Sequence, residues 1–168
     1  MNKYILTIAI GVLAFITTSF SKDTVVPTKN IDYTNTKKAH FAGGCFWGVE
    51  HLFEKQKGVK DVVSGFMGGH VENPSYRAVI KGDTGHVETV EVVYDSSEIS
   101  YESLAKLFFE IHDSTQKNGQ GPDIGSQYLS VVFYENEEEK RTSEKLIEIL
   151  KAKGYAVATT LKPSSPFY

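Results

Sequence analysis

Cys45 is the only cysteine among the 168 residues, and its neighbours suit a reactive thiol better than a buried filler residue. In the stretch HFAGGCFWGVE it follows two glycines and precedes Phe46 and Trp47. A glycine pair permits a tight turn, and the apolar spacing that follows predicts a helix beginning at the cysteine. Free backbone N–H groups and the helix dipole stabilise a thiolate at that position. We therefore interpret Cys45 as a nucleophile beside an apolar wall; for the two rings, plain core packing is the alternative.

The other residue types do not combine into a metal or phosphate site. The five histidines show none of the spacings of zinc ligands, and one cysteine is too few for a structural zinc site. The glycine-rich stretch GFMGGH lacks the lysine of a phosphate-binding loop. We interpret His86 as a histidine of a surface turn, with a supporting position near the site as the alternative. We expect no metal and no bound cofactor.

A long loop, HDSTQKNGQGPDIG, covers residues 112–125 and has almost no apolar side chain. Long loops without secondary structure in compact domains are usually functional or disordered. This loop leads directly into a clear strand pattern, so we interpret it as functional.

The segments around these residues alternate between strand-like and helix-like patterns. Strands are predicted at 38–44, 59–69, 86–95, 126–134 and 155–163, and helices at 45–58, 73–82, 100–113 and 135–154. Asn73 and Ser100 are predicted to cap the starts of their helices, and Gly154 to end the last one. The period-two pattern of 86–95 predicts a half-buried strand. This alternation favours an α/β or a two-layer α+β domain.

The first 21 residues have the layout of a secretory signal peptide. Lys3 is their only charged residue, residues 4–16 are almost wholly apolar, and small residues around Ser21 suit cleavage. We predict an exported, periplasmic protein; an uncleaved membrane anchor is the alternative. The predicted organisation is a signal peptide at 1–21, a polar linker at 22–37 and one catalytic domain at 38–168.

Composition bounds the remaining possibilities. A chain of 168 residues with 40% hydrophobic content is long enough for one well-buried domain and short for two. Its 18 Lys and Arg residues nearly balance 21 Asp and Glu residues, so no basic excess indicates a nucleic-acid partner. We expect a monomer.

Four stretches together resemble the A-type peptide methionine sulfoxide reductases (MsrA), and the match runs in order from about residue 41 to residue 168. They are GCFWGVE, NPSYRAVIKGDTGHVETVEVVYD, ISYESLAKLFFEIHD and QGPDIGSQYLSVVFY. The resemblance implies reduction of the S epimer of methionine sulfoxide, free or in proteins, as repair of oxidative damage. It also implies an α+β fold: a two-layer sandwich of ferredoxin-like topology with elaborations.

By motif position, the resemblance assigns roles to seven residues. Cys45 would attack the sulfoxide sulfur and become a sulfenic acid, and Phe46 and Trp47 would hold the methyl group of the substrate. Glu88 would be the acid. From pattern alone, Glu88 would be taken for a solvent-facing strand residue; the resemblance reverses that interpretation.

Two tyrosines and one aspartate complete the site that the resemblance implies. Tyr76 and Tyr128 would donate hydrogen bonds to the sulfoxide oxygen, and Asp123 would match the aspartate of the family's site. Many members continue beyond the PFY at which this sequence stops, often with cysteines that resolve the sulfenic acid, so we expect either a short product or a C-terminally truncated fragment. With one cysteine, an external reductant must restore the thiol: a thioredoxin-like protein or a small thiol.

Two other functions remain open at this point. A single-cysteine thiol peroxidase would use the same activated thiolate on peroxides, without the acid and the tyrosines. A non-catalytic module that binds methionine-like side chains would keep the aromatic residues without needing Cys45.

Overall fold

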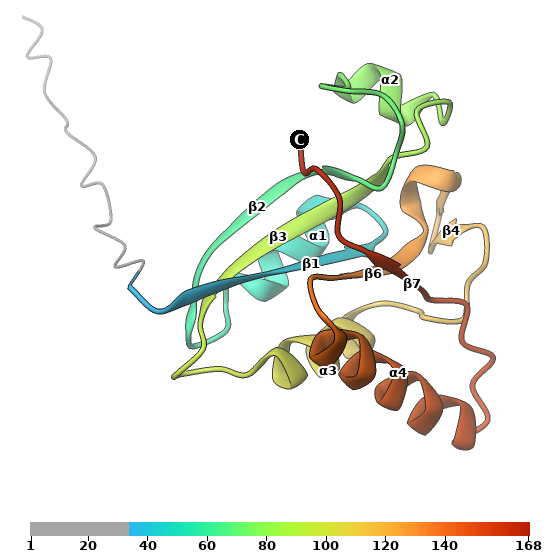
Figure 1. Cartoon of the computed structure of the whole chain (residues 1–168). Coiled ribbons are helices and arrows are strands. Elements are labelled where there is room, and N and C mark those ends of the chain that lie inside the picture. The colour runs from blue at the N-terminus through green and yellow to red at the C-terminus, as the bar shows by residue number, and fades with distance from the viewer. Residues whose placement is uncertain (1–33) are drawn as a thin grey trace, which may run out of the picture. The chain divides into compact units, whose positions relative to one another are not determined.

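The computed structural model describes residues 34–168, which are coloured in Figure 1. The predicted signal peptide at 1–21 and most of the predicted linker lie outside the described residues. Within the described part of the chain, no helix is long and apolar enough to span a membrane.

A five-stranded sheet with the order β2-β3-β1-β6-β7 forms the centre of the fold. β3 is antiparallel to both β1 and β2, β6 is antiparallel to β1, and β7 is parallel to β6. The strands are β1 (Thr36–Gly43), β2 (Val59–Met67), β3 (Val87–Asp95), β6 (Ser130–Tyr134) and β7 (Thr160–Pro163).

Three helices pack on one face of the sheet: α1 (Phe46–Phe53), α3 (Tyr101–Ile111) and α4 (Glu137–Ala152). Their buried residues share a single core cluster with those of β1, β2, β3 and β6. The smaller elements are α2 (Tyr76–Ile80), which stands apart at the top of Figure 1, the hairpin of β4 (Gly119–Gln120) and β5 (Asp123–Ile124), and the 3₁₀ helix η1 (Ser126–Tyr128).

The chain order β1-α1-β2-β3-α3-β6, with β3 between β1 and β2 in the sheet, is the split βαβ arrangement of ferredoxin-like folds. α2, the β4–β5 hairpin and the α4–β7 unit are additions to it. The predicted two-layer α+β fold is confirmed.

The C-terminal residues cover the other face of the sheet, as the path from β7 toward β2 in Figure 1 shows. Phe66 and Tyr168 exchange two backbone hydrogen bonds, of 2.9 and 3.1 Å. Phe167 packs so closely on Gly65 that a Cβ there would lie 2.4 Å from its ring. The second core cluster, which includes Val87, is packed beneath Phe167. β3 is therefore buried on both faces, and the prediction of a half-buried strand is wrong because it did not anticipate this cover.

Of the three predicted residues that cap or end a helix, two are confirmed and one is wrong. Ser100 Oγ accepts a hydrogen bond from Ser103 N at 3.1 Å, and Gly154 follows α4 with φ of +93°. Asn73 is not the N-cap of α2, because its φ of +46° differs from the extended backbone of an N-cap. Ser75 has that conformation, and its Oγ accepts from Ala78 N at 3.2 Å.

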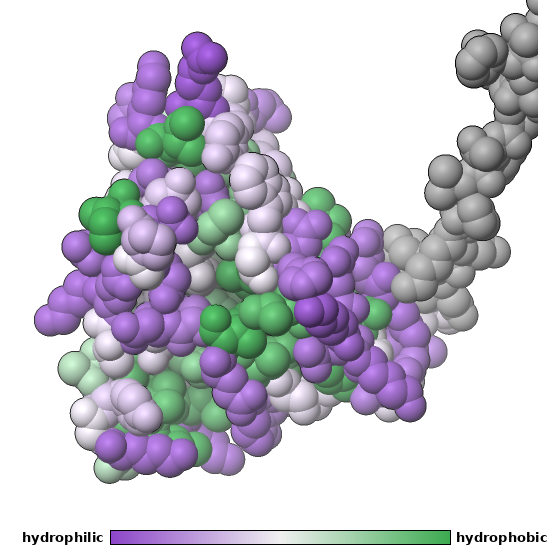
Figure 2. Space-filling model, turned by 180° about the vertical axis from the view of Figure 1, so that it is seen from behind, coloured by the Kyte–Doolittle hydropathy of each residue, from purple (hydrophilic) through white to green (hydrophobic). Residues whose placement is uncertain are grey.

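Two predicted strands are shorter than expected. The segment 126–134 begins with η1, so that its strand starts at Ser130, and the segment 155–163 is a strand only in β7. On the surface, Figure 2 shows apolar side chains gathered in the middle of one face and polar side chains around them. The exposed large apolar residues include Trp47, Tyr76, Ile124 and Tyr155.

Candidate active site

Cys45 is the residue that caps α1, immediately after the end of β1. Its carbonyl oxygen accepts hydrogen bonds from Gly48 N at 3.2 Å and Val49 N at 3.5 Å, and its side chain is partly exposed. Gly44 has φ of +93°, and a Cβ there would lie 2.5 Å from the Cβ of Gln120. The chain thus needs glycine at position 44 to turn from β1 into α1, as the sequence predicted.

Glu88 places its carboxyl group beside this turn, although it is 43 positions further along the chain. It belongs to β3, on the face that α1 covers, and its side chain is only 2% exposed. Its Oε2 accepts a hydrogen bond of 3.1 Å from Phe46 N, within the protein interior. Because that N–H belongs to the peptide bond that follows Cys45, the carboxyl group and the thiol meet at the same end of α1.

Burial raises the pKa of Glu88 above its ordinary value of 4.5. The N–H of Phe46 opposes this effect because it stabilises the carboxylate, whereas the negative charge of Asp123 adds to it. The net result favours the protonated acid over a wider pH range than for an exposed glutamate.

The long loop brings Asp123 and Tyr128 to the same place. Asp123 lies on β5 and Tyr128 in η1, which packs against β3. Burial raises the pKa of Tyr128 and keeps its hydroxyl a proton donor; the charge of Glu88 contributes next, and Tyr76 and Asp123 contribute further. The structure thus brings four side chains that carry oxygen atoms close to one another: Glu88, Asp123, Tyr128 and Tyr76.

Aromatic rings line the other side of this position. The centroid of Phe46 lies 5.4 Å from that of Trp47, 5.8 Å from that of Phe66 and 6.3 Å from that of Tyr76. Phe46 is buried, whereas Trp47 is 63% exposed and Tyr76 is 45% exposed. The aromatic cluster is therefore buried at Phe46 and exposed at Trp47 and Tyr76, so that a small apolar group can reach it from solvent.

All seven predicted site residues lie in this region, and sequence reasoning missed two others. Phe66 completes the aromatic cluster, and its place on β2 directly opposite Glu88 is its only signal. Gln120 packs on Gly44 and fixes the loop, because its side chain bonds to Asp113 N at 2.9 Å and to Asp113 O at 3.0 Å.

His86 is buried, so its interpretation as a surface-turn residue is wrong. Its Nδ1 accepts a hydrogen bond from Gly69 N at 3.1 Å, and Nε2 therefore donates to Val71 O at 2.8 Å. Its ring also meets the edge of Tyr168. The alternative of a supporting residue agrees with these contacts, which hold the backbone after β2.

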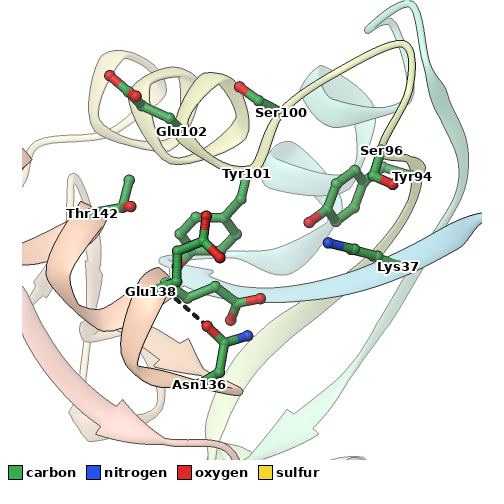
Figure 3. A pocket seen from close by; sticks show the side chains of 10 residues that line it. Lys37, Tyr94, Ser96, Ser100, Tyr101, Glu102, Asn136, Glu138 and Thr142 are labelled. Atoms are coloured by element: carbon green, nitrogen blue, oxygen red, sulfur yellow. Dashed lines mark hydrogen bonds between the residues drawn. The ribbon is translucent and has the colours of Figure 1, made fainter.

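A separate cavity of about 270 Å³ lies between β1, β3 and the first turns of α3 and α4 (Figure 3). Glutamates, tyrosines and small polar residues line it, with Lys37 opposite Glu138. None of the seven predicted site residues takes part in it. Among the described residues, no three His, Cys, Asp or Glu side chains are grouped to hold a metal ion.

This fold and site define a class: an α+β enzyme with a cysteine at a helix start, a buried acid beside it and a partly exposed cluster of aromatic rings. The family model described as peptide methionine sulfoxide reductase matches residues 37–168. The chain therefore belongs to the peptide methionine sulfoxide reductase family, and it is an oxidoreductase that reduces methionine sulfoxide.

Individual relatives agree with this family membership. The chain is 50% identical over 131 residues to peptide methionine sulfoxide reductase MsrA of Nautilia profundicola, covering 78% of this chain and 76% of that protein. The crystal structure of Mxr1 from Saccharomyces cerevisiae in reduced form has a TM-score of 0.76 at 35% identity, covering 83% of each chain. Mxr1 in complex with Trx2 has a TM-score of 0.61 at 26% identity, covering 83% of this chain and 86% of that one.

The resemblance found from the motifs is thus confirmed. The thiol peroxidase and the methionine-binding module are set aside as functions, because the family's members are methionine sulfoxide reductases.

Proposed function

We propose that Cys45 is the nucleophile and Glu88 the acid in the reduction of methionine sulfoxide. One observation carries the proposal: the buried carboxyl group of Glu88 is held by the N–H of Phe46, next to the peptide group of Cys45. A sulfoxide oxygen is a poor leaving group and must be protonated as its sulfur accepts the thiolate. General acid catalysis of this kind typically contributes about 10²–10⁴-fold.

In the proposed reaction, the sulfur of Cys45 bonds to the sulfoxide sulfur while Glu88 protonates the oxygen. The oxygen then passes to the cysteine sulfur, and both the sulfur–oxygen bond of the substrate and the new bond between the two sulfurs break, so that methionine leaves. Starting from the thiol, the products are methionine and a sulfenic acid on Cys45, so the substrate is reduced by two electrons and the cysteine oxidised by two.

Tyr76 and Tyr128 donate hydrogen bonds to the sulfoxide oxygen, and Asp123 helps to keep Glu88 protonated by its charge. The raised pKa values of Tyr128 and Glu88 support these roles, because each shift favours the form that carries the proton.

Phe46 and Trp47 receive the methyl group of the substrate. The methyl group meets aromatic rings while the oxygen meets the acid and the phenols, so the two substituents on the chiral sulfur are not interchangeable. We infer a preference for the S epimer, free or in proteins. Chiral chromatography of the substrate that remains from a racemic mixture tests this: the S form should disappear and the R form should persist. Equal consumption of both forms would contradict the proposed pocket.

A thioredoxin-like protein or a small thiol restores Cys45. Two external thiols convert the sulfenic acid back to a thiol, with formation of one disulfide and one water. The complex of the relative Mxr1 with Trx2 supports a thioredoxin-like reductant.

We also propose that the protein is exported to the periplasm, on the strength of the charge and apolar pattern of residues 1–21. The intact mass of the protein from the cell envelope tests this. A mass without those residues supports cleavage and export, and the full mass in the cytoplasm contradicts them.

A further inference from the structure

His112, Ser130 and Thr159 form a chain of hydrogen bonds beneath the turn that carries Cys45. His112 Nδ1 lies 2.5 Å from the carbonyl oxygen of Phe108, and His112 Nε2 lies 2.7 Å from Ser130 Oγ. Ser130 Oγ in turn lies 2.8 Å from Thr159 Oγ1. Ser130 and Thr159 are both buried. The proposed chemistry uses none of these three side chains.

The carbonyl oxygen of Phe108 determines which atom donates in each of these hydrogen bonds. A carbonyl oxygen only accepts, so His112 Nδ1 carries a hydrogen. Burial lowers the pKa of His112, so that the ring is neutral at physiological pH and Nε2 is an acceptor. The hydroxyl of Ser130 therefore donates to Nε2, and the hydroxyl of Thr159 donates to Ser130.

This chain closes the segment that carries two of the site residues. His112 follows the last turn of α3, and Ser130 begins β6, 18 positions later. The long loop and η1, with Asp123 and Tyr128, lie between them. The bond between the two side chains, here called the His112–Ser130 clasp, therefore joins the two ends of that segment.

The clasp also lies against the backbone that leads to Cys45. Gly43 is paired with Ser130 in the sheet. A Cβ at Gly43 would lie 2.8 Å from the ring of Phe108 and 3.3 Å from the ring of His112. His112 therefore bonds the end of the segment that carries Asp123 and Tyr128 and also packs against the backbone before α1.

We propose that His112 is a positioning residue, whose clasp with Ser130 sets the place of Asp123 and Tyr128 relative to Cys45. The inference rests on the proposed function, because it requires that Asp123 and Tyr128 take part in the reaction. His112 itself contacts no substrate. Misplacing reacting groups by about 1 Å can cost on the order of 10²-fold in rate, so that a partial loosening should cost roughly tenfold.

The decisive variant is Ser130→Ala, which removes the donor to His112 Nε2. With saturating reductant, kcat should fall roughly tenfold, with a smaller change in KM, because the aromatic wall is not part of the clasp. The alkaline limb of the pH profile should move to lower pH. Asp123 raises the pKa of Glu88 by its charge, and this effect weakens when Asp123 moves away. Among other titratable groups, Tyr128 interacts electrostatically with Glu88, and Cys45 precedes the N–H of Phe46 that Glu88 binds.

Ser143→Ala is the matched control. Ser143 is fully buried and bonds to Tyr101 Oη at 3.0 Å and Glu139 O at 2.9 Å, between α3 and α4. Its loss removes a buried hydroxyl of the same size, lowers stability in a comparable way, and should leave both kcat and the alkaline limb unchanged. A second pair of variants tests Thr159, at the far end of the hydrogen-bond chain. Thr159→Val should reproduce part of the defect of Ser130→Ala, and Thr159→Ser should behave as wild type.

Nitrogen NMR of the wild-type protein tests the clasp without any activity measurement and without a variant that must fold. His112 should be the neutral tautomer with hydrogen on Nδ1, and hydrogen on Nε2 would overturn the proposal. Wild-type kcat and pH profile in Ser130→Ala would also overturn it.

The variants Asp123→Asn and Tyr128→Phe distinguish a failure of the clasp proposal from a failure of the proposed roles of Asp123 and Tyr128 in the reaction. If both are impaired while Ser130→Ala is not, only the clasp proposal fails. If both show wild-type activity, their proposed roles fail, and the clasp proposal fails with them.

Discussion

Glu88 Oε2 and the backbone nitrogen of Phe46 lie 3.1 Å apart, which joins the interior sheet strand β3 to the first turn of α1. This bond uses a free N–H at the helix start and places a buried carboxyl group at the only cysteine of the chain. The same position would stabilise a carboxylate, but burial and Asp123 act in the opposite direction and raise the pKa of Glu88. The acid and the thiol thus lie at the same end of α1.

Replacing Glu88 with glutamine should abolish most of the turnover, because the isosteric amide keeps the hydrogen bond to Phe46 but cannot supply a proton. A loss of about 10²–10⁴-fold is expected. Cys45 should still react with a small alkylating reagent, which shows that the thiol and the fold are intact. Wild-type turnover under saturating reductant would exclude Glu88 as the acid.

The activity of the wild-type enzyme should fall on the alkaline side as Glu88 loses its proton. The pKa that governs this limb lies above 4.5, because burial favours the neutral acid. Single-turnover rates measured across pH, with the release of methionine as the readout, provide the check. Rates that stay constant from acid to alkaline pH would contradict this origin of the limb.

Stability should depend on pH through the same group. Below about 4.5 Glu88 is neutral in both the folded and unfolded states. Between that value and its raised folded pKa, only the unfolded state releases the proton, so that the free energy of unfolding falls as pH rises. Glu88→Gln should therefore match wild type in acid and be more stable at alkaline pH. Thermal unfolding of both proteins at several pH values measures this, and a constant difference across pH would refute it.

The two neighbouring aromatic residues should behave differently when truncated. Phe46→Ala should cost about 3–5 kcal/mol of stability, because the ring is buried in the core. Trp47→Ala should leave stability nearly unchanged and raise KM, because that ring is 63% exposed at the rim of the site. Denaturant unfolding and steady-state kinetics separate these effects. A large loss of stability in Trp47→Ala would show that its ring belongs to the core.

Much of this fold can be predicted from local pattern, because local chemistry decides it. Ser100 and Gly154 bound their helices through hydrogen bonding and backbone conformation within a few residues, and the glycine turn before Cys45 is equally local. The prediction of Asn73 as a cap is wrong because Ser75, two positions later, is also a capping residue type, and only the backbone angles show which of the two caps α2.

The remaining features depend on contacts between distant segments. The burial of both faces of β3 needs Phe167, and Phe66 joins the site only through its pairing with Glu88. The selection of Glu88 itself came from motif resemblance, since its place in an alternating strand does not distinguish it from Glu91. His86 is buried because Gly69 and Tyr168 pack on its ring.

Gly44 and Gly48 should respond in opposite ways to alanine. At Gly44, the positive φ of +93° and the close approach of Gln120 should cost at least about 1–2 kcal/mol. At Gly48, within α1, a Cβ meets nothing within 4 Å, and alanine should stabilise the helix by about 0.5–1 kcal/mol. Unfolding free energies of the two variants test this pair. A stable Gly44→Ala protein would contradict the described turn.

The central claim is that Cys45 attacks the sulfoxide and keeps its oxygen as a sulfenic acid. The most direct test is a single turnover of the 168-residue protein without reductant, followed by trapping with a dimedone-type reagent and mass spectrometry. The chain contains no second cysteine that could resolve the sulfenic acid. About one methionine per enzyme should therefore be released before the reaction stops, with the adduct on Cys45. An unmodified thiol after methionine release, or several turnovers without reductant, would contradict the mechanism.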